Sequence, residues 1–467
     1  MKLRILSFIA VLCLAFGTAF SLSSCDVVMS SGISDARINE DGELVITFHD
    51  GREQNLGTVV GKDGVDGTDG ADGKDGIDGK DGIDGKDGID GKDGLDGEDG
   101  KDGILSESSV SGNLAIASAK GLRSAVSIVC KFTRTVKTSG FRPTTRVEEY
   151  SSAGSGVIYE LIASEGDAFI ITNYHVVYDA DSDTEDGISD DISVYLYGSE
   201  YEDYAIKATY VGGSLYYDIA VLRIEDSEAL KDSDVVAVTL KNSDTVSVGE
   251  DAIAIGNPCS DGISATYGYI SVDSEEISML GADNATSVTF RVMRIDTPIN
   301  SGNSGGGLYN KNGELIGIVN AKMIDDGVEN IAYAIPSNIA AAVADNVIDN
   351  CFDKENARVM RPSLGITVSA TESKAVYDSK TGLVHIVEQI AVFELSQGSI
   401  CNGLIEIGDI FVSATIGDTT TEITRSYQIP DLLLTLREGD AISFVILRAG
   451  VEISVTVTIT DACISAY

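Results

Sequence analysis

The most restrictive feature of this sequence is a run in which glycine recurs at every third position. Fourteen consecutive Gly-x-Asp triplets extend from Gly61 to Asp102. This period is typical of three polyproline-type chains wound around one axis, because only glycine fits where the three backbones meet. At a rise of about 3 Å per residue, such a helix would be roughly 120 Å long. Residues 61–103 are therefore predicted to form an extended stalk rather than a globular domain.

The composition of the stalk leaves two other interpretations open. The repeat contains no proline, and its six lysines stand against fifteen acidic residues. Chains without proline are less preorganised for the triple helix, and their excess negative charge makes them repel one another. The segment resembles bacterial collagen-like repeats in its glycine period and departs from them in lacking proline. A disordered acidic spacer and a weak Ca²⁺-binding aspartate array are the alternatives.

The N-terminal residues 1–25 combine a basic start, an apolar run and a final group of small residues. This order is typical of a secretory signal peptide. Its end, Leu22-Ser23-Ser24-Cys25, resembles the lipobox of bacterial lipoproteins, in which the cysteine becomes the lipidated first residue. The alternative is an ordinary signal peptide with an incidental cysteine. We therefore expect a bacterial lipoprotein outside the cytoplasm, anchored by Cys25 to a membrane at the cell surface or in the periplasm.

Charge and cysteine usage narrow the possible partners and cofactors. The 467 residues include 33 basic and 74 acidic side chains, a formal net charge of −41 that disfavours nucleic acid as a partner. Five cysteines remain after Cys13 and Cys25 are set aside, and none forms a CxxC pair. This pattern argues against a disulfide framework or a zinc site, although one disulfide stays possible. No cofactor and no metal are expected.

Turn residues and apolar runs divide the rest of the chain into modules. Two Asp-Gly turns between alternating apolar positions predict a small β meander before the stalk. Many short β-like runs follow the stalk and indicate a barrel or sandwich, which ends in a helix capped by Ser337 and Asn338. The predicted modules are a β module at 26–60, the stalk, a linker at 104–115, an all-β domain at 116–350 and a further β domain at 358–467.

Three residues in the all-β domain have side chains suited to acyl transfer. The run AFIITNYHVV predicts an apolar strand with His175 at its end. Asp218 precedes the strand-like run IAVLRI, and Ser304 lies in the glycine-rich stretch DTPINSGNSGGGLYN. Acyl transfer needs a hydroxyl, an imidazole to accept its proton and a carboxylate to orient that imidazole. The mature chain has only two other histidines, His49 and His385, so an accidental match has few opportunities.

Each of these residues has a simpler interpretation when taken alone. The histidine could be a structural hydrogen-bonding residue, the aspartate a turn residue and the glycine-rich stretch a flexible loop. The stretch also matches the G-x-S-x-G pattern of the α/β-hydrolase nucleophile elbow, whose aspartate and histidine follow the serine. Only His385 lies downstream, in a separate module, and no strand and helix alternation surrounds Ser304. The hydrolase fold is therefore excluded.

The order His175, Asp218, Ser304 is instead that of the chymotrypsin-type double β-barrel. Seven motifs between residues 116 and 345 closely resemble, in order, the motif series of the HtrA (Deg) family of serine proteases: GSGVIY, ITNYHVV, DIAVLRI, AIGNP, DTPINSGNSGGGLYN, GELIGIVNA and YAIPSN. The resemblance implies a mainly β chain whose protease domain is a chymotrypsin-like double barrel. It also implies that Ser304 is the nucleophile, His175 the general base and Asp218 its orienting partner.

The same resemblance assigns the oxyanion hole to the backbone N–H groups of Gly302 and Ser304, with Asn303 between them. Donors of this kind are commonly worth roughly 3 kcal/mol each in the transition state. HtrA proteins usually carry proline where this chain has Ser301 and Gly307, so the loop is less stiffened here. If this loop is ordered only by substrate or by a neighbouring subunit, the protease would be inactive until one of them binds.

The resemblance places Pro298 and Ile299 at the base of the primary specificity pocket and Asn320 in its wall. No acidic residue stands there to attract lysine or arginine, so we expect an apolar pocket that takes small aliphatic side chains. Glutamyl endopeptidases share part of the serine motif but depend on a histidine in the pocket wall. The stretch GIVNA at 317–321 has none.

The last module carries three motifs, RPSLGI, EIGDIF and VILRAGVEISVTVTI, that resemble a PDZ domain. The resemblance implies that Leu364, Gly365 and Ile366 hold the carboxylate of a peptide C-terminus, which adds to the domain as a β-strand. The stretch 388–404 fits the family pattern poorly.

Together these features predict a lipid-anchored HtrA-like serine endopeptidase that cleaves unfolded or damaged proteins. HtrA proteases are typically trimers, and a collagen-like helix is also a trimer, so we expect a homotrimer. Two rival interpretations remain: a holdase that binds exposed chains without cutting them, and a collagen-like surface adhesin that carries the protease as cargo.

Overall fold

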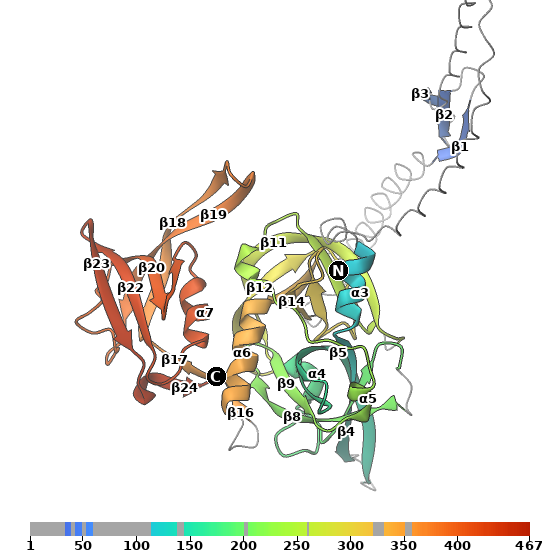
Figure 1. The fold of residues 1–467 in the computed structure, drawn as a ribbon, viewed down its shortest axis with the longest axis horizontal. Helices are drawn as coiled ribbons and strands as arrows, with labels where there is room; N and C mark the ends of the chain where they lie inside the picture. The colour runs from blue at the N-terminus through green and yellow to red at the C-terminus, as the bar shows by residue number, and fades with distance from the viewer. Residues whose placement is uncertain are drawn as a thin grey trace, which may run out of the picture. The chain divides into compact units, whose positions relative to one another are not determined.

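The chain forms two compact units, residues 1–97 and 98–467. The predicted signal peptide with Cys25 and the Gly-x-Asp stalk lie outside the described residues. The computed structural model describes residues 33–38, 43–48, 53–58, 114–137, 144–199, 204–258, 261–320, 331–350 and 357–467, drawn in Figure 1.

Within the first unit, three strands form an antiparallel meander in the order β1-β2-β3. Val45 is buried, and Arg37 and Glu53 form an exposed ion pair at 2.7 Å across the sheet. The strands are β1 (Ile33–Ile38), β2 (Glu43–Phe48) and β3 (Glu53–Thr58).

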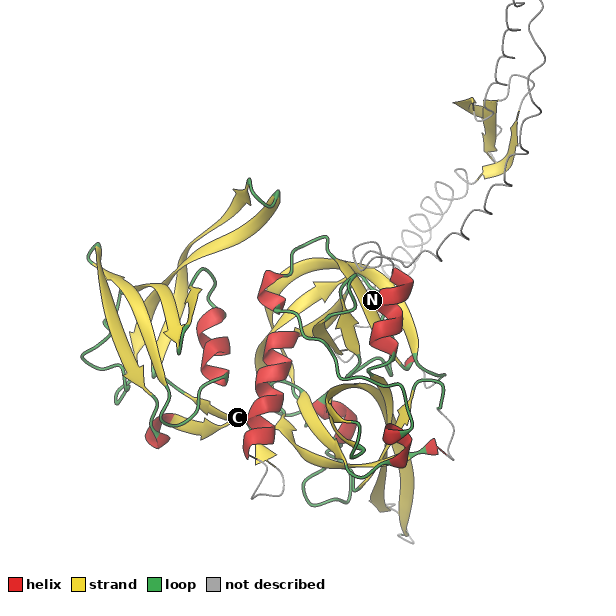
Figure 2. Cartoon of the chain, viewed as in Figure 1, coloured by secondary structure: helices red, strands yellow, loops and turns green. Residues whose placement is uncertain are grey.

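Two β-barrels make up the first part of the second unit (Figure 2). In the first, the β8–β9 pairing closes six antiparallel strands, and the short β16 adds to β8 in parallel. Its interior is a buried cluster that includes Ile128, Ile170 and Leu222. The strands are β4 (Ala125–Lys137), β5 (Thr145–Ile162), β6 (Asp167–Thr172), β7 (Asp191–Leu196), β8 (Ile206–Ser214), β9 (Ile219–Ile224) and β16 (Ala357–Arg358).

The second barrel is closed in the order β10-β11-β12-β15-β14-β13. Its interior packs around Met293, Leu308 and Ile316. The double β-barrel implied by the sequence is thereby confirmed. The strands are β10 (Asp251–Gly256), β11 (Ser264–Leu280), β12 (Ser287–Ile295), β13 (Gly307–Tyr309), β14 (Leu315–Asn320) and β15 (Ala332–Pro336).

A third apolar cluster joins the barrels to the helices. It brings Val157 of the first barrel together with Ile318 of the second and Val343 of helix α6. Helix α6 lies against β8, β9 and β14 (Figure 1). The helices of this region are α3 (Leu114–Leu122), α4 (Tyr174–Val177), α5 (Glu228–Lys231) and α6 (Ser337–Asn350).

The predicted cap of helix α6 is wrong. The helix begins at Ser337 itself, and the Ser337 hydroxyl donates to the carbonyl oxygen of Lys241 at 2.8 Å. The Asn338 side-chain oxygen accepts from the backbone N–H of Ser243 at 3.1 Å. Both side chains therefore tie the helix to the distant segment 241–243 instead of closing its first turn.

The C-terminal part has its own sheet in the order β18-β19-β20-β22-β23, with β21 paired to β20. In its core, Phe411 packs edge-to-face against Phe444, with ring centroids 5.0 Å apart. The elements are β17 (Met360–Pro362), β18 (Ile366–Asp378), β19 (Leu383–Leu395), β20 (Ile410–Ile416), β21 (Thr419–Glu422), α7 (Gln428–Leu434), β22 (Ala441–Arg448), β23 (Val451–Thr458) and β24 (Ile464–Ala466).

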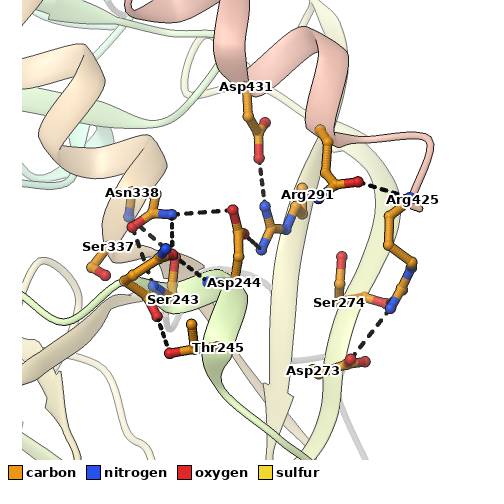
Figure 3. A network of polar contacts seen from close by, with 12 residues as sticks. Ser243, Asp244, Thr245, Asp273, Ser274, Arg291, Ser337, Asn338, Arg425 and Asp431 are labelled. Carbon is orange, nitrogen blue, oxygen red and sulfur yellow. Dashed lines mark hydrogen bonds and ion pairs between the residues drawn. The ribbon is translucent and has the colours of Figure 1, made fainter. Parts of the chain in front are cut away.

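Arg291 of β12 links the second barrel to helix α7 of the C-terminal domain. Figure 3 shows its guanidinium between two carboxylates, Asp244 and Asp431. The Asp244 oxygen lies 2.7 Å away, and the guanidinium also covers the Tyr427 ring at 3.7 Å from its centroid. A second arginine, Arg425, pairs with Asp273 of β11. The two domains are therefore joined by a largely buried ionic network, in which loss of one partner would leave an uncompensated charge.

This network predicts a pH-dependent contribution to stability. Burial, opposed by Arg291, raises the pKa of the Asp431 carboxyl from 3.8 to about 6. Because the pKa is higher in the folded state, the resulting stabilisation is fully present below about pH 4 and is lost as the pH rises through about 6. Relative to Asp431→Asn, the wild-type free energy of unfolding should fall by up to about 3 kcal/mol between about pH 4 and pH 7. Urea unfolding of both proteins measures this; a difference that does not change with pH would contradict it.

Three cysteines in the described parts, Cys130, Cys401 and Cys463, are free and buried. Burial raises the pKa of the Cys130 thiol to about 12, which leaves it unreactive. Within the described ranges, no helix has the length and apolar character to cross a bilayer.

Candidate active site

The three predicted catalytic side chains lie in three separate segments between strands. Strand β6 ends at Thr172, and His175 lies in the short helix α4 that follows, not at the end of a strand as predicted. Between the two, the Asn173 side-chain amide donates to the carbonyl oxygen of Asp218 at 2.9 Å. Asp218 directly precedes β9, as predicted, and Ser304 lies in the loop between β12 and β13.

His175 and Asp218 are joined by two hydrogen bonds. His175 Nδ1 lies 2.7 Å from Asp218 Oδ2, and the backbone N–H of His175 donates to Asp218 Oδ1 at 2.9 Å. An ionised carboxylate only accepts hydrogen bonds, so Nδ1 must carry the hydrogen. In the neutral ring Nε2 is then unprotonated and can accept a proton from a hydroxyl.

Asp218 is held by its backbone as well as by its carboxylate. Its φ is +50°, in the left-handed region that few residues other than glycine adopt. Its carbonyl oxygen accepts from the backbone N–H of Tyr174 at 3.1 Å in addition to the Asn173 amide. Unusual backbone geometry of this kind persists only where the surroundings fix it, and it is frequent at functional sites.

Asn320 is a partner of Asp218 that the sequence did not reveal. Predicted to line the specificity pocket, it is fully buried at the end of β14 and donates from Nδ2 to Asp218 Oδ2 at 2.8 Å. Asn320 and His175 therefore both form a hydrogen bond with Asp218 Oδ2. No local pattern signals this contact, because 102 positions separate the two residues in the chain.

The loop that carries Ser304 is shaped by two glycines with positive φ. The Asn303 N–H donates to the Asn300 carbonyl at 3.1 Å, and Gly302 has φ +98°, which is the geometry of a type II turn. Gly305 has φ +82° and donates its N–H to Val319 of β14 at 3.0 Å. Ser304 is thus presented by a folded turn rather than by a loose loop.

The two predicted oxyanion donors are available in this turn. Within the described residues, the backbone N–H groups of Gly302 and Ser304 donate to no partner, and Ser304 forms no hydrogen bond with His175. Ser304 itself is only 6% exposed. Catalytic hydrogen bonds are often long without substrate and tighten when it binds, so this arrangement is compatible with a nucleophile.

The predicted pocket residues differ in their surroundings. Pro298 is exposed, and its carbonyl oxygen accepts from the hydroxyl of Thr266 at 2.9 Å. Ile299 is half-buried and packs against the interior of the second barrel. These two therefore lie together on the segment before the Ser304 turn, whereas Asn320 directs its amide to Asp218.

The predicted carboxylate-binding residues lie at the start of strand β18. Leu364 is buried, and its carbonyl oxygen accepts from the Ser399 hydroxyl at 2.6 Å. Gly365 has φ +67°, and Ile366 begins β18. Strand β18 stands at one edge of its sheet, so among the described strands only β19 pairs with it. Such an edge can accept an added strand.

Two family models and several serine proteases are similar to this chain. A trypsin-like peptidase domain model matches residues 154–318, and a collagen triple helix repeat model matches residues 51–112. A serine protease Do-like HtrA from Lactococcus lactis is 31% identical over 67% of this chain and 71% of its own. A probable periplasmic serine endoprotease DegP-like protein from Pseudomonas savastanoi is also 31% identical, over 67% of this chain and 57% of its own. A solved structure of the HtrA-type protease AlgW with a decapeptide, at 26% identity, covers 74% of this chain and 98% of its own with a TM-score of 0.45.

Proposed function

Given that the chain belongs to the HtrA family of serine proteases, we propose that His175, Asp218 and Ser304 form the catalytic triad of this serine endopeptidase. The observation that carries the proposal is the 2.7 Å contact between His175 Nδ1 and Asp218 Oδ2, made while Asp218 is also held by Asn320. This arrangement fixes the tautomer and orientation that a general base for a serine hydroxyl requires.

The reaction then follows from the roles of these groups. Ser304 Oγ attacks the scissile carbonyl while His175 Nε2 takes its proton, and the Asp218 carboxylate stabilises the resulting imidazolium. The negative charge on the substrate oxygen is met by the N–H groups of Gly302 and Ser304. His175 gives its proton to the leaving amine, and water releases the acyl group by the same steps.

The substrates proposed are unfolded or damaged proteins outside the cytoplasm, reached by an enzyme anchored through lipidated Cys25. An extended chain can present its backbone carbonyls to Ser304, whereas a folded domain keeps them in internal hydrogen bonds. The test is incubation with reduced β-casein and, separately, with a stably folded protein. Cleavage of casein alone, absent in Ser304→Ala, is expected. Equal cleavage of both, or casein cleavage that survives in Ser304→Ala, would contradict the proposal.

The C-terminal domain is proposed to act as a PDZ domain. A peptide C-terminus would add to the free edge of β18, with its carboxylate at the Leu364–Ile366 loop. The support is the positive φ of Gly365, which shapes the loop, and the buried anchoring of Leu364. Binding of a labelled peptide should be lost when its C-terminus is amidated; equal binding of both forms would exclude this mode.

The Gly-x-Asp stalk and the protease are proposed to share one threefold axis in a homotrimer. A triple helix brings three N-terminal ends together, which raises the effective concentration of the attached protease domains. Removal of residues 61–103 is expected to weaken the trimer, as measured by mass in solution over a dilution series. Unchanged trimer stability, with no polyproline-type circular dichroism in the intact protein, would contradict a shared axis.

A further inference from the structure

Ser155 of strand β5 is buried and makes four hydrogen bonds around the nucleophile turn. Its backbone N–H donates to the carbonyl oxygen of Ser304 at 2.8 Å, and its hydroxyl donates to the carbonyl oxygen of Gly302 at 2.7 Å. The same hydroxyl accepts from the backbone N–H of Asn257 at 2.8 Å, and the Ser155 carbonyl accepts from the Thr172 hydroxyl at 2.7 Å. One side chain of the first barrel thus contacts the turn that carries both predicted oxyanion donors.

The hydroxyl of Ser155 restrains the peptide that links Gly302 to Asn303. This planar unit carries the Gly302 carbonyl at one end, which accepts from Ser155, and the Asn303 N–H at the other, which donates to Asn300. The peptide cannot rotate without losing both bonds. Since Ser301 rather than proline occupies the second position of the turn, the bond from Ser155 is a restraint that the turn residues do not supply.

A second restraint fixes the peptide that follows Ser304. Its carbonyl oxygen accepts from the Ser155 N–H, and the N–H of Gly305 donates to Val319. Between the two restrained peptides, the Asn303 carbonyl accepts from Gly306 at 3.0 Å. In a trans peptide the N–H points opposite to the carbonyl, so the Ser304 N–H is directed away from Gly306. The peptide that carries the Ser304 N–H therefore lies between two restrained peptides.

The surroundings of the Ser155 hydroxyl leave it little freedom to turn elsewhere. A Cβ added at Gly256 would lie 2.8 Å from both the Ser155 hydroxyl and the Asn303 side-chain oxygen. Glycine at this position lets strand β10 approach closely, which brings the Asn257 N–H to the hydroxyl oxygen. With that oxygen accepting from Asn257, the single hydroxyl hydrogen remains for the Gly302 carbonyl.

We propose that Ser155 is a positioning residue for catalysis. Its hydroxyl and its N–H hold the peptides on either side of the Asn303–Ser304 peptide, so that the Ser304 N–H stays aimed at the oxyanion. The inference rests on the proposed endopeptidase function. It assigns to Ser155 an effect on the transition state and not on substrate binding, because the restrained Ser304 N–H faces charge that develops only during attack.

The experiment compares wild type, Ser155→Ala, Ser155→Thr and Ser127→Ala in steady-state hydrolysis of fluorescein-labelled β-casein. Ser127 is a matched control, because it is similarly buried and its hydroxyl accepts from the Asn257 side chain at 2.6 Å. Among the described residues, its side chain has no hydrogen bond to the 302–305 turn. Ser155→Ala is expected to lower kcat by about tenfold to a hundredfold with little change in KM, since one buried carbonyl loses its donor. Ser155→Thr, which keeps the hydroxyl, should recover part of kcat, and Ser127→Ala should lower kcat by less than about threefold.

Thermal unfolding of the four proteins separates positioning from general loss of structure. If Ser155→Ala and Ser127→Ala lose similar stability but only the former loses kcat, the proposal stands. Equal losses of kcat in the two alanine variants, or a loss confined to KM, would overturn the proposal while leaving the protease function intact. An inactive wild type would overturn the proposed function and, with it, this inference.

Discussion

Replacing Asp218 with asparagine is expected to lower kcat/KM for casein by about ten-thousandfold. The asparagine amide can donate a hydrogen bond, so it can place its N–H against His175 Nδ1 and favour the tautomer with hydrogen on Nε2. That ring cannot accept the Ser304 proton. Because the substrate does not touch Asp218, the loss should lie in kcat, as measured by steady-state kinetics.

Asp226→Asn is the matched control for this variant. Asp226 also has a positive φ, of +49°, but it is exposed and pairs with Lys231 instead of a histidine. Its replacement should leave kcat/KM within about twofold of wild type, because exposed ion pairs contribute little. Similar activities in the two variants would mean that Asp218 does not orient the base.

Replacing Gly305 with alanine is expected to cause the largest loss of stability of any single change near the site. A Cβ at this position would lie 2.2 Å from the Ser155 carbonyl oxygen and 2.3 Å from the Thr172 hydroxyl, and the φ of +82° disfavours a side chain. The strain and the displaced hydrogen bonds together should cost more than about 3 kcal/mol in the free energy of unfolding. Activity should be lost as well, since displacement of Ser155 would also disturb its N–H and hydroxyl, which hold the Ser304 turn.

Gly249→Ala separates the steric clash from backbone strain. Gly249 has φ +89°, but an added Cβ would meet no atom within 4 Å. This variant should lose only about 1 kcal/mol, the usual cost of a non-glycine residue at positive φ. Urea unfolding of both variants gives the comparison, and equal losses would show that the contacts with Ser155 and Thr172 are not the cause.

Local patterns of the sequence predict an all-β barrel or sandwich and the chain order of the candidate site, and the resemblance to the HtrA family implies the double barrel. Short apolar strands close barrels, and the chemistry of acyl transfer admits few residue types beyond those at His175, Asp218 and Ser304. The positive φ of a glycine such as Gly302 can also be predicted once the sequence indicates a turn there.

Contacts between residues far apart in the chain were not predictable in the same way. The Asn320 amide reaches Asp218 and the Arg291 guanidinium reaches Asp431 only after the barrels and the C-terminal domain have packed. The cap predicted at Ser337 failed for the same physical reason, since the carbonyl of Lys241 offers its hydroxyl a tertiary partner. A side chain that could cap its own helix takes another partner when a distant group supplies a better hydrogen bond.

Covalent labelling of the folded wild-type protein with a fluorophosphonate tests the central claim most directly. Only an activated serine reacts, so peptide mass spectrometry should find one adduct, on Ser304, and none in Ser304→Ala or His175→Ala. No adduct on the wild type, even with a peptide ligand for the C-terminal domain present, or an adduct that persists in Ser304→Ala, would contradict a Ser304 protease and favour a chain that binds unfolded proteins without cutting them.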